Sequence, residues 1–400
     1  MVEFETEEDM PKRKINLKKI IGIITIFFLI IITIVLYILY NKNEEFRIWT
    51  NRYILEKETY QGNTINIKID NLDSSMVYAY DKYIAILHKK NIELYNMIGN
   101  KETSIAVEIN SPIFKSRGRY LAVAEKGGKK IYLIADKKIL WENEIEGKIS
   151  DITVNKNGFV AVSIADTTYK TVINTYNSKG KELFKVFLAN TRVTDMSISS
   201  DSKYLALAEV DTTGTLIQSN VKVYSIEDAQ KDTVNAMKKV YSATKDKLIA
   251  NIEYQNKLVC MYNDSIDICS NTDKNTEEST DNKELINTND KKMIFMSINL
   301  ENCVISIEEK TTNAFNSVSY LSIINSVTEK ETNITIDEIP KQVYTCGNKI
   351  ILNLGTELEV YNTDAKKIKR YISSQEINNI VASNNIIGIV YKDKIEVIDI

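Results

Sequence analysis

A short unit that recurs from residue 63 to residue 400 constrains the fold of this chain more than any other feature. Its first half is a turn followed by alternating aromatic, aliphatic and small residues, as in DKYIAIL (81–87), RGRYLAVA (117–124), NGFVAVS (157–163) and DSKYLALA (201–208). Its second half is an aliphatic alternation that often ends in Tyr-Asn, as in IELYN (92–96), INTYN (173–177), VKVYS (221–225) and LEVYN (358–362). Alternation with a period of two, bounded by turn residues, predicts β-strands.

The spacing of the unit predicts a β-propeller. Less faithful copies of the second half extend the series to eight anchor residues, which are Tyr95, Ile134, Tyr176, Tyr224, Cys269, Ile324, Tyr361 and Ile398. The anchors lie 37 to 55 residues apart, which matches the length of a four-stranded propeller blade. We therefore expect an all-β propeller of eight four-stranded blades. Seven blades is the alternative, because the pattern is irregular around 244–300.

The third repeat shows how four strands divide within a blade. We expect 149–155 to be the innermost strand, followed outward by 159–165, 171–177 and 182–188. The last repeat, by contrast, ends on a third strand, and the orphan strand NTINIKI (63–69) precedes the first blade. This strand is expected to complete the last blade, which would join the two ends of the propeller and remove an exposed sheet edge.

An apolar stretch precedes the repeats. Residues 20–40, IIGIITIFFLIIITIVLYILY, contain no charged residue, and a helix of about 20 apolar residues spans the hydrocarbon core of a bilayer. Five cations precede the stretch within residues 12–19, so the positive-inside rule keeps the N-terminal side in the cytoplasm. A cleaved signal peptide is the competing interpretation, although no small-x-small cleavage site follows.

These features divide the chain into a cytoplasmic tail (1–19), a transmembrane helix (20–40), a juxtamembrane linker (41–62) and an extracytoplasmic propeller (63–400). In the linker, Trp49 and Tyr53 either sit at the bilayer interface as anchors or pack under the propeller. The polar segment 270–289, SNTDKNTEESTDNKELINTN, contains no aromatic residue. Such a composition buries little apolar surface, so we expect a mobile loop there, which is either a tolerated insertion or a functional loop.

The charge balance excludes some classes of partner. After residue 19 the chain holds 46 basic and 49 acidic residues, and a dedicated nucleic-acid binder would show a clear basic excess. The cysteines are Cys260, Cys269, Cys303 and Cys346, and no two of them form a CxxC pair. They are best interpreted as small core residues, although Cys260 and Cys269 flank a predicted turn and a bridge between them is geometrically conceivable.

Some of the repeats resemble known propeller motifs. SSDSKYLALA (199–208) resembles the opening of WD-repeat strands, without the diagnostic Gly-His or Trp-Asp pairs. YNSKGKELFKV (176–186) and IADKKILWENEI (134–145) are similar to the outer-strand motif D-x-x-x-G-K-x-x-W of quinoprotein-type blades. Trp141 matches the tryptophan of that motif, whereas Phe184 and Tyr371 replace it. The whole arrangement resembles uncharacterised bacterial single-span membrane proteins with a WD-repeat/quinoprotein-like propeller ectodomain, and this resemblance transfers no catalytic residue.

No residue pattern points to a catalytic, cofactor or metal site. His88, the one histidine, follows a predicted strand and is interpreted as a surface residue near a turn, since a zinc site or a triad needs further partners. Gly127-Gly128 with Lys129-Lys130 is better explained by a hairpin than by a phosphate loop. Carboxylate pairs such as Glu308 and Glu309 are expected at this charge content. Quinoprotein dehydrogenases carry adjacent cysteines, which are missing here, so no cofactor is expected.

We expect a non-enzymatic role from these observations. The protein would be a membrane-anchored, extracytoplasmic scaffold or sensor that binds a protein or polymer of the cell envelope. One alternative is a degenerate quinoprotein-like or hydrolytic enzyme that uses carboxylates of the central channel, and another is an assembly factor for neighbouring membrane proteins. Exposed tyrosines mark interaction surfaces, but the sequence does not sort Tyr78 and Tyr80 into core or surface residues.

Overall fold

The computed structural model describes residues 17–42, 46, 50, 65–69, 72–242, 247–269, 282–287, 292–313 and 316–398. The chain divides into two compact units, Met1–Lys57 and Glu58–Ile400. Residues 1–16 of the predicted tail (1–19) and most of the linker, including Trp49 and Tyr53, lie outside the described residues.

The first unit contains helix α1 (Leu17–Lys42), which includes the whole apolar stretch 20–40. Large apolar side chains of this helix from Ile26 to Leu39 are exposed. Within the described residues, no helix is both long enough and apolar enough to cross a membrane.

The second unit is an eight-bladed β-propeller, and each blade is an antiparallel sheet of four strands. Blades 1 to 4 comprise, from the innermost strand outward, β2 (Val77–Tyr80), β3 (Tyr83–His88), β4 (Asn91–Tyr95), β5 (Lys101–Ala106); β6 (Pro112–Arg117), β7 (Tyr120–Glu125), β8 (Lys130–Ala135), β9 (Lys138–Glu144); β10 (Lys148–Val154), β11 (Val160–Ala165), β12 (Thr171–Tyr176), β13 (Glu182–Leu188); and β14 (Thr191–Ile198), β15 (Tyr204–Asp211), β16 (Gln218–Ser225), β17 (Met237–Ser242). The strand order predicted for blade 3 is confirmed.

The remaining four blades follow the same order. They comprise β18 (Ile249–Tyr254), β19 (Leu258–Tyr262), β20 (Ser265–Cys269), β21 (Asn282–Asn287); β22 (Lys292–Leu300), β23 (Cys303–Asn313), β24 (Asn316–Asn325), β25 (Glu331–Ile336); β26 (Gln342–Cys346), β27 (Lys349–Asn353), β28 (Glu357–Asn362), β29 (Lys367–Ile372); and β30 (Asn379–Ala382), β31 (Ile387–Val390), β32 (Lys394–Ile398), β1 (Ile65–Lys68). Two short helical turns, η1 (Ser74–Met76) and α3 (Ile226–Ala229), lie in connections.

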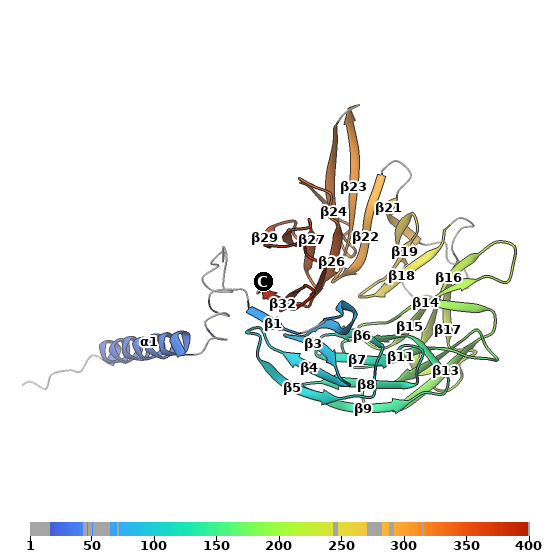
Figure 1. Cartoon of the computed structure of the whole chain (residues 1–400), viewed down its shortest axis with the longest axis horizontal. Coiled ribbons are helices and arrows are strands. Elements are labelled where there is room, and N and C mark those ends of the chain that lie inside the picture. The colour runs from blue at the N-terminus through green and yellow to red at the C-terminus, as the bar shows by residue number, and fades with distance from the viewer. Residues whose placement is uncertain are drawn as a thin grey trace, which may run out of the picture. The chain divides into compact units, whose positions relative to one another are not determined.

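The ring closes as the sequence predicts. Strand β1 pairs antiparallel with β32, so that Ile67 lies opposite Ile395 and the last blade takes its outer strand from the start of the propeller. The innermost strands β30 and β2 also contact each other. In Figure 1 the colour runs once round the ring and red β32 lies beside blue β1. Eight blades are therefore correct, and the seven-blade alternative is wrong.

The Tyr-Asn ending of the repeat has a structural cause. All eight anchor residues lie on third strands, where most of them are buried. The asparagine that follows the tyrosine closes the turn to the outer strand: the side-chain oxygen of Asn177 accepts from the backbone N–H groups of Lys179 (2.9 Å) and Lys181 (3.1 Å). Asn96 and Asn362 form the same turn, as expected of asparagine in tight turns.

Small residues and hydrogen bonds join neighbouring blades. Ala122, Ala161 and Ala206 on second strands are fully buried, which allows the sheets to approach closely. A hydrogen bond crosses each of the eight blade interfaces, through the pairs Tyr80–Arg119, Asn143–Gly180, Asn155–Ser199, Asp195–Ile252, Gln255–Asn302, Ser297–Thr345, Tyr344–Ala382 and Ser383–Asp81.

The tryptophan of the quinoprotein-like motif also acts between blades. Trp141 on β9 is buried, and its indole packs against the Gly180 backbone and the Tyr176 ring of blade 3. Gly180 has a φ of +78°, and a Cβ there would lie 2.7 Å from Trp141 Cγ. The turn therefore needs glycine for both its conformation and its close approach.

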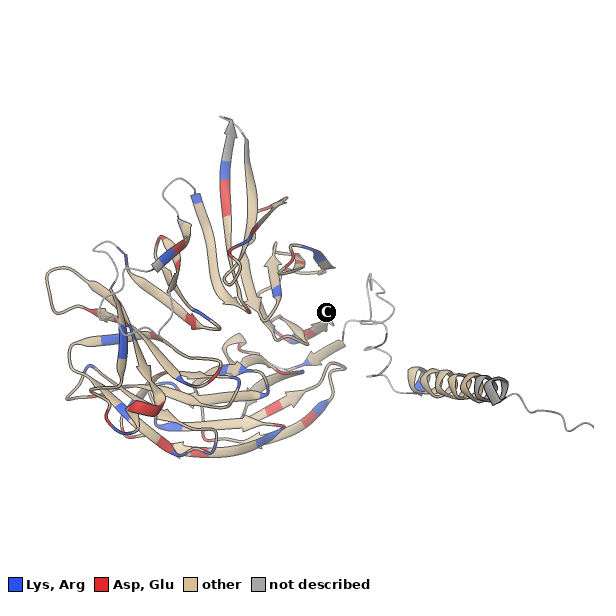
Figure 2. Cartoon of the chain, turned by 180° about the vertical axis from the view of Figure 1, so that it is seen from behind, with Lys and Arg blue, Asp and Glu red and all other residues tan. Residues whose placement is uncertain are grey.

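One expectation about the irregular region is wrong in part. We expected a mobile loop over 270–289, but residues Asn282–Asn287 form β21, the outer strand of blade 5. Ile286 of this strand is buried and pairs with Ile266 on β20, so a blade edge is covered by a segment whose overall composition is polar. The rest of 270–289 lies outside the described residues. Figure 2 shows Lys, Arg, Asp and Glu distributed over many strands of the propeller.

Candidate functional site

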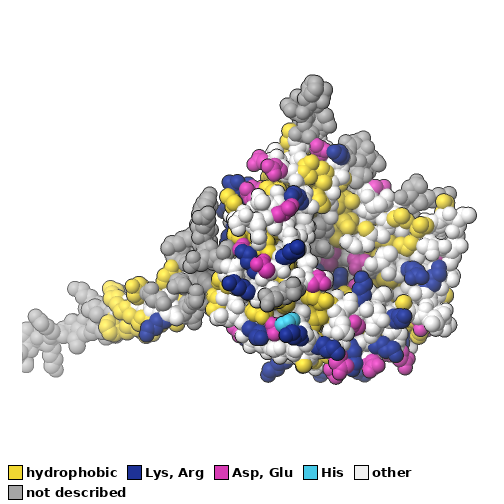
Figure 3. Space-filling view, viewed as in Figure 1, with side chains coloured by type: hydrophobic (Ala, Val, Ile, Leu, Met, Phe, Trp, Pro, Cys, Tyr) yellow, Lys and Arg dark blue, Asp and Glu magenta, His cyan; other side chains and the backbone are white. Residues whose placement is uncertain are grey.

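The strand order gives the propeller two distinct faces. Connections from second to third strands, and from one blade to the next, lie on one face, which we call the pocket face; the other connections lie on the entry face. Strand β1 begins on the entry face, because Ile65 pairs with Val397 near the end of β32. Figure 3 shows acidic and basic side chains interspersed on the surface in one view, without a field of a single sign.

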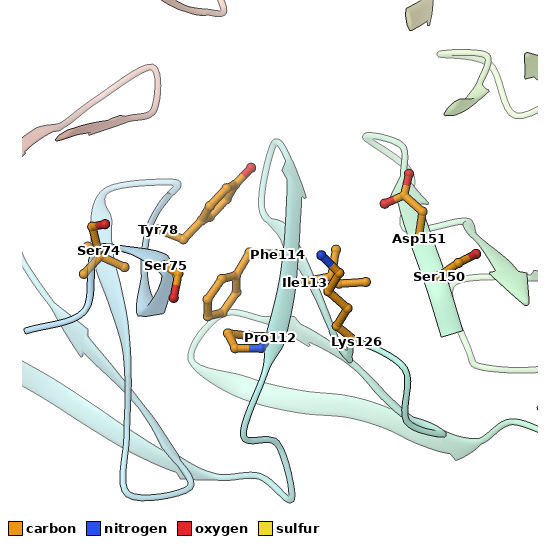
Figure 4. A pocket seen from close by; sticks show the side chains of 10 residues that line it. Ser74, Ser75, Tyr78, Pro112, Ile113, Phe114, Lys126, Ser150 and Asp151 are labelled. Carbon is orange, nitrogen blue, oxygen red and sulfur yellow. The ribbon is translucent and has the colours of Figure 1, made fainter. Parts of the chain in front are cut away.

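A pocket of about 360 Å³ opens on the pocket face, where the inner strands of blades 1, 2 and 3 begin. It is lined by Ser74, Ser75, Val77, Tyr78, Pro112, Ile113, Phe114, Lys126, Ser150 and Asp151. Figure 4 shows that these side chains come from η1, β2, β6, β10 and the connection after β7.

One wall of the pocket is aromatic. The ring of Tyr78 stacks on Phe114 with centroids 5.5 Å apart and planes 19° apart. Phe114 is buried and Tyr78 is half-buried, so Tyr78 and the neighbouring Pro112 present the apolar surface to a ligand. Tyr80, two residues on, is fully buried and donates its hydroxyl to the Arg119 carbonyl. The structure thus sorts the two tyrosines: Tyr78 lines the pocket and Tyr80 belongs to the core.

The opposite wall is polar, with Lys126, Ser150 and Asp151. The pairing of β10 with β11 shifts register between Ile149 and Asp151, and this β-bulge surrounds Ser150. A bulge re-aims side chains at the end of a strand, and here it leaves Ser150 exposed and Asp151 half-buried. Burial raises the pKa of the Asp151 carboxyl, and the opposing influences of Lys115 and the Ile152 N–H are smaller.

The rim between the two walls is held by backbone hydrogen bonds. The N–H of Lys126 donates to the Ser111 carbonyl (2.7 Å), and the N–H of Gly127 donates to the Ile149 carbonyl (2.8 Å). Gly127-Gly128 therefore belongs to the hairpin between β7 and β8, as predicted, and it connects blade 2 to blade 3. These contacts hold the pocket in a preformed shape, which favours binding because less ordering is needed.

The same bulge recurs in blade 4 and places Asp195 differently. There the register shifts between Val193 and Asp195. The Asp195 carboxylate accepts from the backbone N–H groups of Ile252 on the next blade and of Met196, both at 2.9 Å. Burial raises its pKa and these hydrogen bonds oppose the rise. Asp195 is thus engaged in closing the interface between blades 4 and 5.

An ion pair crosses the centre of the ring. Arg117 at the end of β6 in blade 2 binds Glu253 on β18 in blade 5. Burial lowers the pKa of the Arg117 guanidinium, against smaller opposing effects of Tyr78 and Glu301. The inner strands thus bring Lys115, Arg117, Asp151, Asp195 and Glu253 to the channel. Sequence reasoning missed all five, although KSR (115–117) and the bulge tripeptides SDI and TDM were visible signals.

The residues singled out in the sequence mostly lie elsewhere. His88 is half-exposed at the end of β3. Glu308 is buried and accepts a hydrogen bond from Ser306, and Glu309 pairs with Lys292. The cysteines Cys260, Cys269 and Cys303 are buried, as predicted for core residues, while Cys346 is half-buried. Within the described residues, no group of three or more His, Cys, Asp and Glu side chains is arranged to hold a metal.

Comparison with family models shows to which protein family the chain belongs. Residues 56–400 match the model of DUF5711, a family of unknown function. This chain is a DUF5711 protein. The match covers the whole propeller unit, including β1 and the closing blade. No curated protein matches the chain.

Solved structures that are similar to this DUF5711 protein have low sequence identity to it. The C-terminal WD40 domain of Sif2 is 12% identical over 86% of this chain and 98% of its own, with a TM-score of 0.50. BamB from Moraxella catarrhalis is 12% identical over 84% and 98%, with a TM-score of 0.48, and the tricorn protease is 13% identical over 78% and 36%, with a TM-score of 0.49. At 12% identity, the similarity to the Sif2 domain shows the propeller fold and no activity.

Proposed function

We propose that this DUF5711 protein is a membrane-anchored, extracytoplasmic β-propeller that acts as a non-enzymatic scaffold or sensor and binds a protein or polymer of the cell envelope through the pocket. The observation that carries the proposal is the preformed pocket, with the Tyr78–Phe114 stack on one wall and Lys126 and Asp151 on the other. Pockets of this size with apolar walls and a few convergent polar groups are typical binding sites.

The chemistry of the pocket indicates what it binds. The half-buried Tyr78 and Pro112 offer an apolar surface, and Lys126 and Asp151 offer one charge of each sign. A complementary ligand has a flat apolar group with hydrogen-bonding or ionic groups beside it, as a peptide or a chain of sugar rings has. A ligand that carries a strong charge of one sign would be repelled by the pocket residue of the same sign. A nucleic acid, for example, would be repelled by Asp151.

The anchor and the two faces support the proposed location. The apolar side chains of α1 from Ile26 to Leu39 are exposed, and lipid would remove them from water. The five cations at 12–19 favour a cytoplasmic N-terminus. Because β1 begins on the entry face, the pocket lies on the opposite face of the propeller from the point where the chain enters it.

A capture experiment with pocket variants tests the proposal. The full-length tagged protein is crosslinked in intact membranes of its own cells, and its partners are compared with those of a chain lacking residues 63–400 and of the double variant Tyr78→Ala/Lys126→Glu. We expect a partner that is captured by the wild type and lost with both. Tyr169→Ala is the matched control, because Tyr169 is an exposed aromatic residue on the same face outside the pocket. Equal capture by wild type and pocket variant contradicts the proposal.

The identity of the partner separates the scaffold role from assembly. Capture of newly made membrane proteins would favour an assembly factor, whereas mature envelope proteins or polymers would favour a scaffold or sensor.

A second candidate function rests on the raised pKa of Asp151. Asp151 lines the pocket and burial raises the pKa of its carboxyl, and a raised carboxyl pKa favours general acid catalysis. If the protein is instead a hydrolytic enzyme, hydrolysis of an envelope polymer by the purified protein would fall at least about 100-fold in Asp151→Asn. Binding without turnover favours the scaffold.

A further inference from the structure

We propose that Cys260 and Cys269 form a disulfide that joins β19 to β20 when the protein folds in the presence of a disulfide donor. The two Sγ atoms lie 3.2 Å apart. Both side chains are almost completely buried, at 0% and 2% exposure. In the reduced protein they are free thiols in contact.

The register of the hairpin explains why the sulfurs meet. Cys260 pairs with Asp267 and Cys269 pairs with Leu258, so the two cysteines are diagonal neighbours on the same side of adjacent antiparallel strands. Diagonal positions are within reach of each other's side chains. The sulfur atoms are about 1 Å further apart than in a disulfide, and closing the bond requires the two strands to shift toward each other, because diagonal neighbours lie about 7–8 Å apart.

The position of the pair gives the bridge a structural role. Blade 5 has a long connection between its third and fourth strands, because β20 ends at Cys269 and β21 begins at Asn282. The outer strand of this blade therefore closes a longer loop than in blades 1, 2, 3, 6 and 7, which makes its pairing entropically more costly. A covalent link between β19 and β20 would fix the hairpin on which β21 assembles.

The chemistry of bridge formation is thiol–disulfide exchange. The thiolate of one cysteine attacks the donor disulfide, which breaks the donor bond, forms a mixed disulfide and releases one donor thiol. The thiolate of the second cysteine then attacks the first cysteine's sulfur and releases the second donor thiol. Two protons leave and two electrons pass to the donor. Burial raises the pKa of Cys269 in the folded protein, so the exchange takes place before the hairpin is covered by its neighbours.

The test is to refold the denatured full-length protein in a mixture of reduced and oxidised glutathione. Free thiols are then alkylated with N-ethylmaleimide under denaturing conditions, and the protein is cleaved with trypsin. Cys260 and Cys269 fall in one tryptic peptide, 258–274, which in the bridged form is unlabelled and lacks two hydrogen atoms. We expect labelling of this peptide to fall about tenfold, while Cys303 and Cys346 stay labelled.

The variant Cys269→Ile provides a folded control, because all seven other blades hold isoleucine or tyrosine at this anchor position. Its Cys260 should be labelled in full. The melting temperature of the refolded wild type should fall on addition of a reductant, whereas that of the variant should not change. Equal labelling of peptide 258–274 and of the Cys303 peptide after refolding in the glutathione mixture overturns the proposal.

Bridge formation in cells rests additionally on the proposed extracytoplasmic location, because cytosolic thiols are kept reduced. The same labelling of protein taken from its own membranes after acid quenching separates the two proposals. A bridge in the refolded protein and in the protein from membranes supports the disulfide site and the extracytoplasmic location. A bridge after refolding but free thiols in cells supports the disulfide site and contradicts the location.

Discussion

Arg117 on β6 and Glu253 on β18 form an ion pair between blades 2 and 5, although the two residues are 136 positions apart in the chain. Adjacent blades are joined by many backbone and side-chain contacts, whereas this pair links blades that are not neighbours. We expect the pair to stabilise the ring by linking two blades that are not adjacent. The side chain of Glu253 is 15% exposed and that of Arg117 is 39% exposed, so the pair is partly shielded from water.

We predict that Glu253→Gln lowers the free energy of unfolding by about 1–2 kcal/mol, between the values for exposed and buried pairs, because it leaves Arg117 partly buried without its partner. The matched control is Glu227→Gln, which breaks the exposed pair of Glu227 and Lys231 and should cost less than about 0.5 kcal/mol. Urea unfolding measures both. Equal losses of unfolding free energy in the two variants would show that the Arg117–Glu253 pair stabilises the ring no more than an exposed surface pair does.

The closing strand should be as important for stability as any internal strand. Ile67 on β1 is buried and lies opposite Ile395. We predict that Ile67→Ala costs about 2–5 kcal/mol, as for other buried aliphatic residues, while Lys68→Ala on the exposed side of the same strand stays within about 0.5 kcal/mol. A small effect of Ile67→Ala in thermal and urea unfolding would mean that β1 is not part of the ring.

The fold could be predicted because the same sequence pattern recurs in each blade. The anchors Tyr95, Tyr176 and Tyr361 mark third strands because each packs against the core between two neighbouring blades and the following asparagine must close a turn. Strand β21 was missed because a polar segment precedes it in the same window, so that Leu285 and Ile286 did not stand out.

The candidate site was not predictable in the same way. Tyr78, Phe114 and Asp151 belong to three blades, and only ring closure brings them to one pocket. The partner of Arg117 is likewise set by the geometry of the ring, since no local pattern connects β6 to β18. The bulge at Ser150 depends on strand pairing, which a single sequence does not reveal.

The contact between Trp141 and Gly180 predicts that replacing glycine by alanine lowers the free energy of unfolding more at position 180 than at position 127. Gly180→Ala should cost about 2–4 kcal/mol, because the new methyl group meets the indole and the backbone has a φ of +78°. Gly127 has a φ of +70° with no atom within 4 Å of an added Cβ, so Gly127→Ala should cost only about 1–2 kcal/mol. Urea unfolding measures the difference. Equal costs would mean that backbone strain alone, and not the blade contact, requires glycine at 180.

The raised pKa of Asp151 predicts a specific pH dependence. The folded protein binds this proton more tightly than the unfolded chain, whose carboxyl has the ordinary value of 3.8. Its contribution to stability therefore falls as the pH rises from 3.8 through the folded-state pKa. Asp151→Asn removes this loss, so its free energy of unfolding should rise relative to that of the wild type as the pH rises from 3.8, and the difference should level off above the folded-state pKa.

Asp166 serves as a control because its pKa is shifted in the direction opposite to that of Asp151. The N–H groups of Tyr169 and Thr168 lower its pKa, so its stabilising contribution is present above 3.8 and is lost as the pH falls through the lower folded-state value. Asp166→Asn should therefore be less stable than the wild type at neutral pH, and the difference should shrink in acid. Parallel pH profiles for the two variants would contradict the assignment of opposite shifts.

The most direct test of the central claim is photo-crosslinking in intact cells from single positions on the two faces of the propeller. A photoreactive amino acid replaces Ser75 at the pocket or Val234, which is 83% exposed on the entry face. Binding through the pocket predicts a defined adduct from position 75 that disappears in the Tyr78→Ala background, and none from position 234. Adducts from position 234 alone, or an adduct from position 75 that is unchanged by Tyr78→Ala, would contradict binding through the pocket.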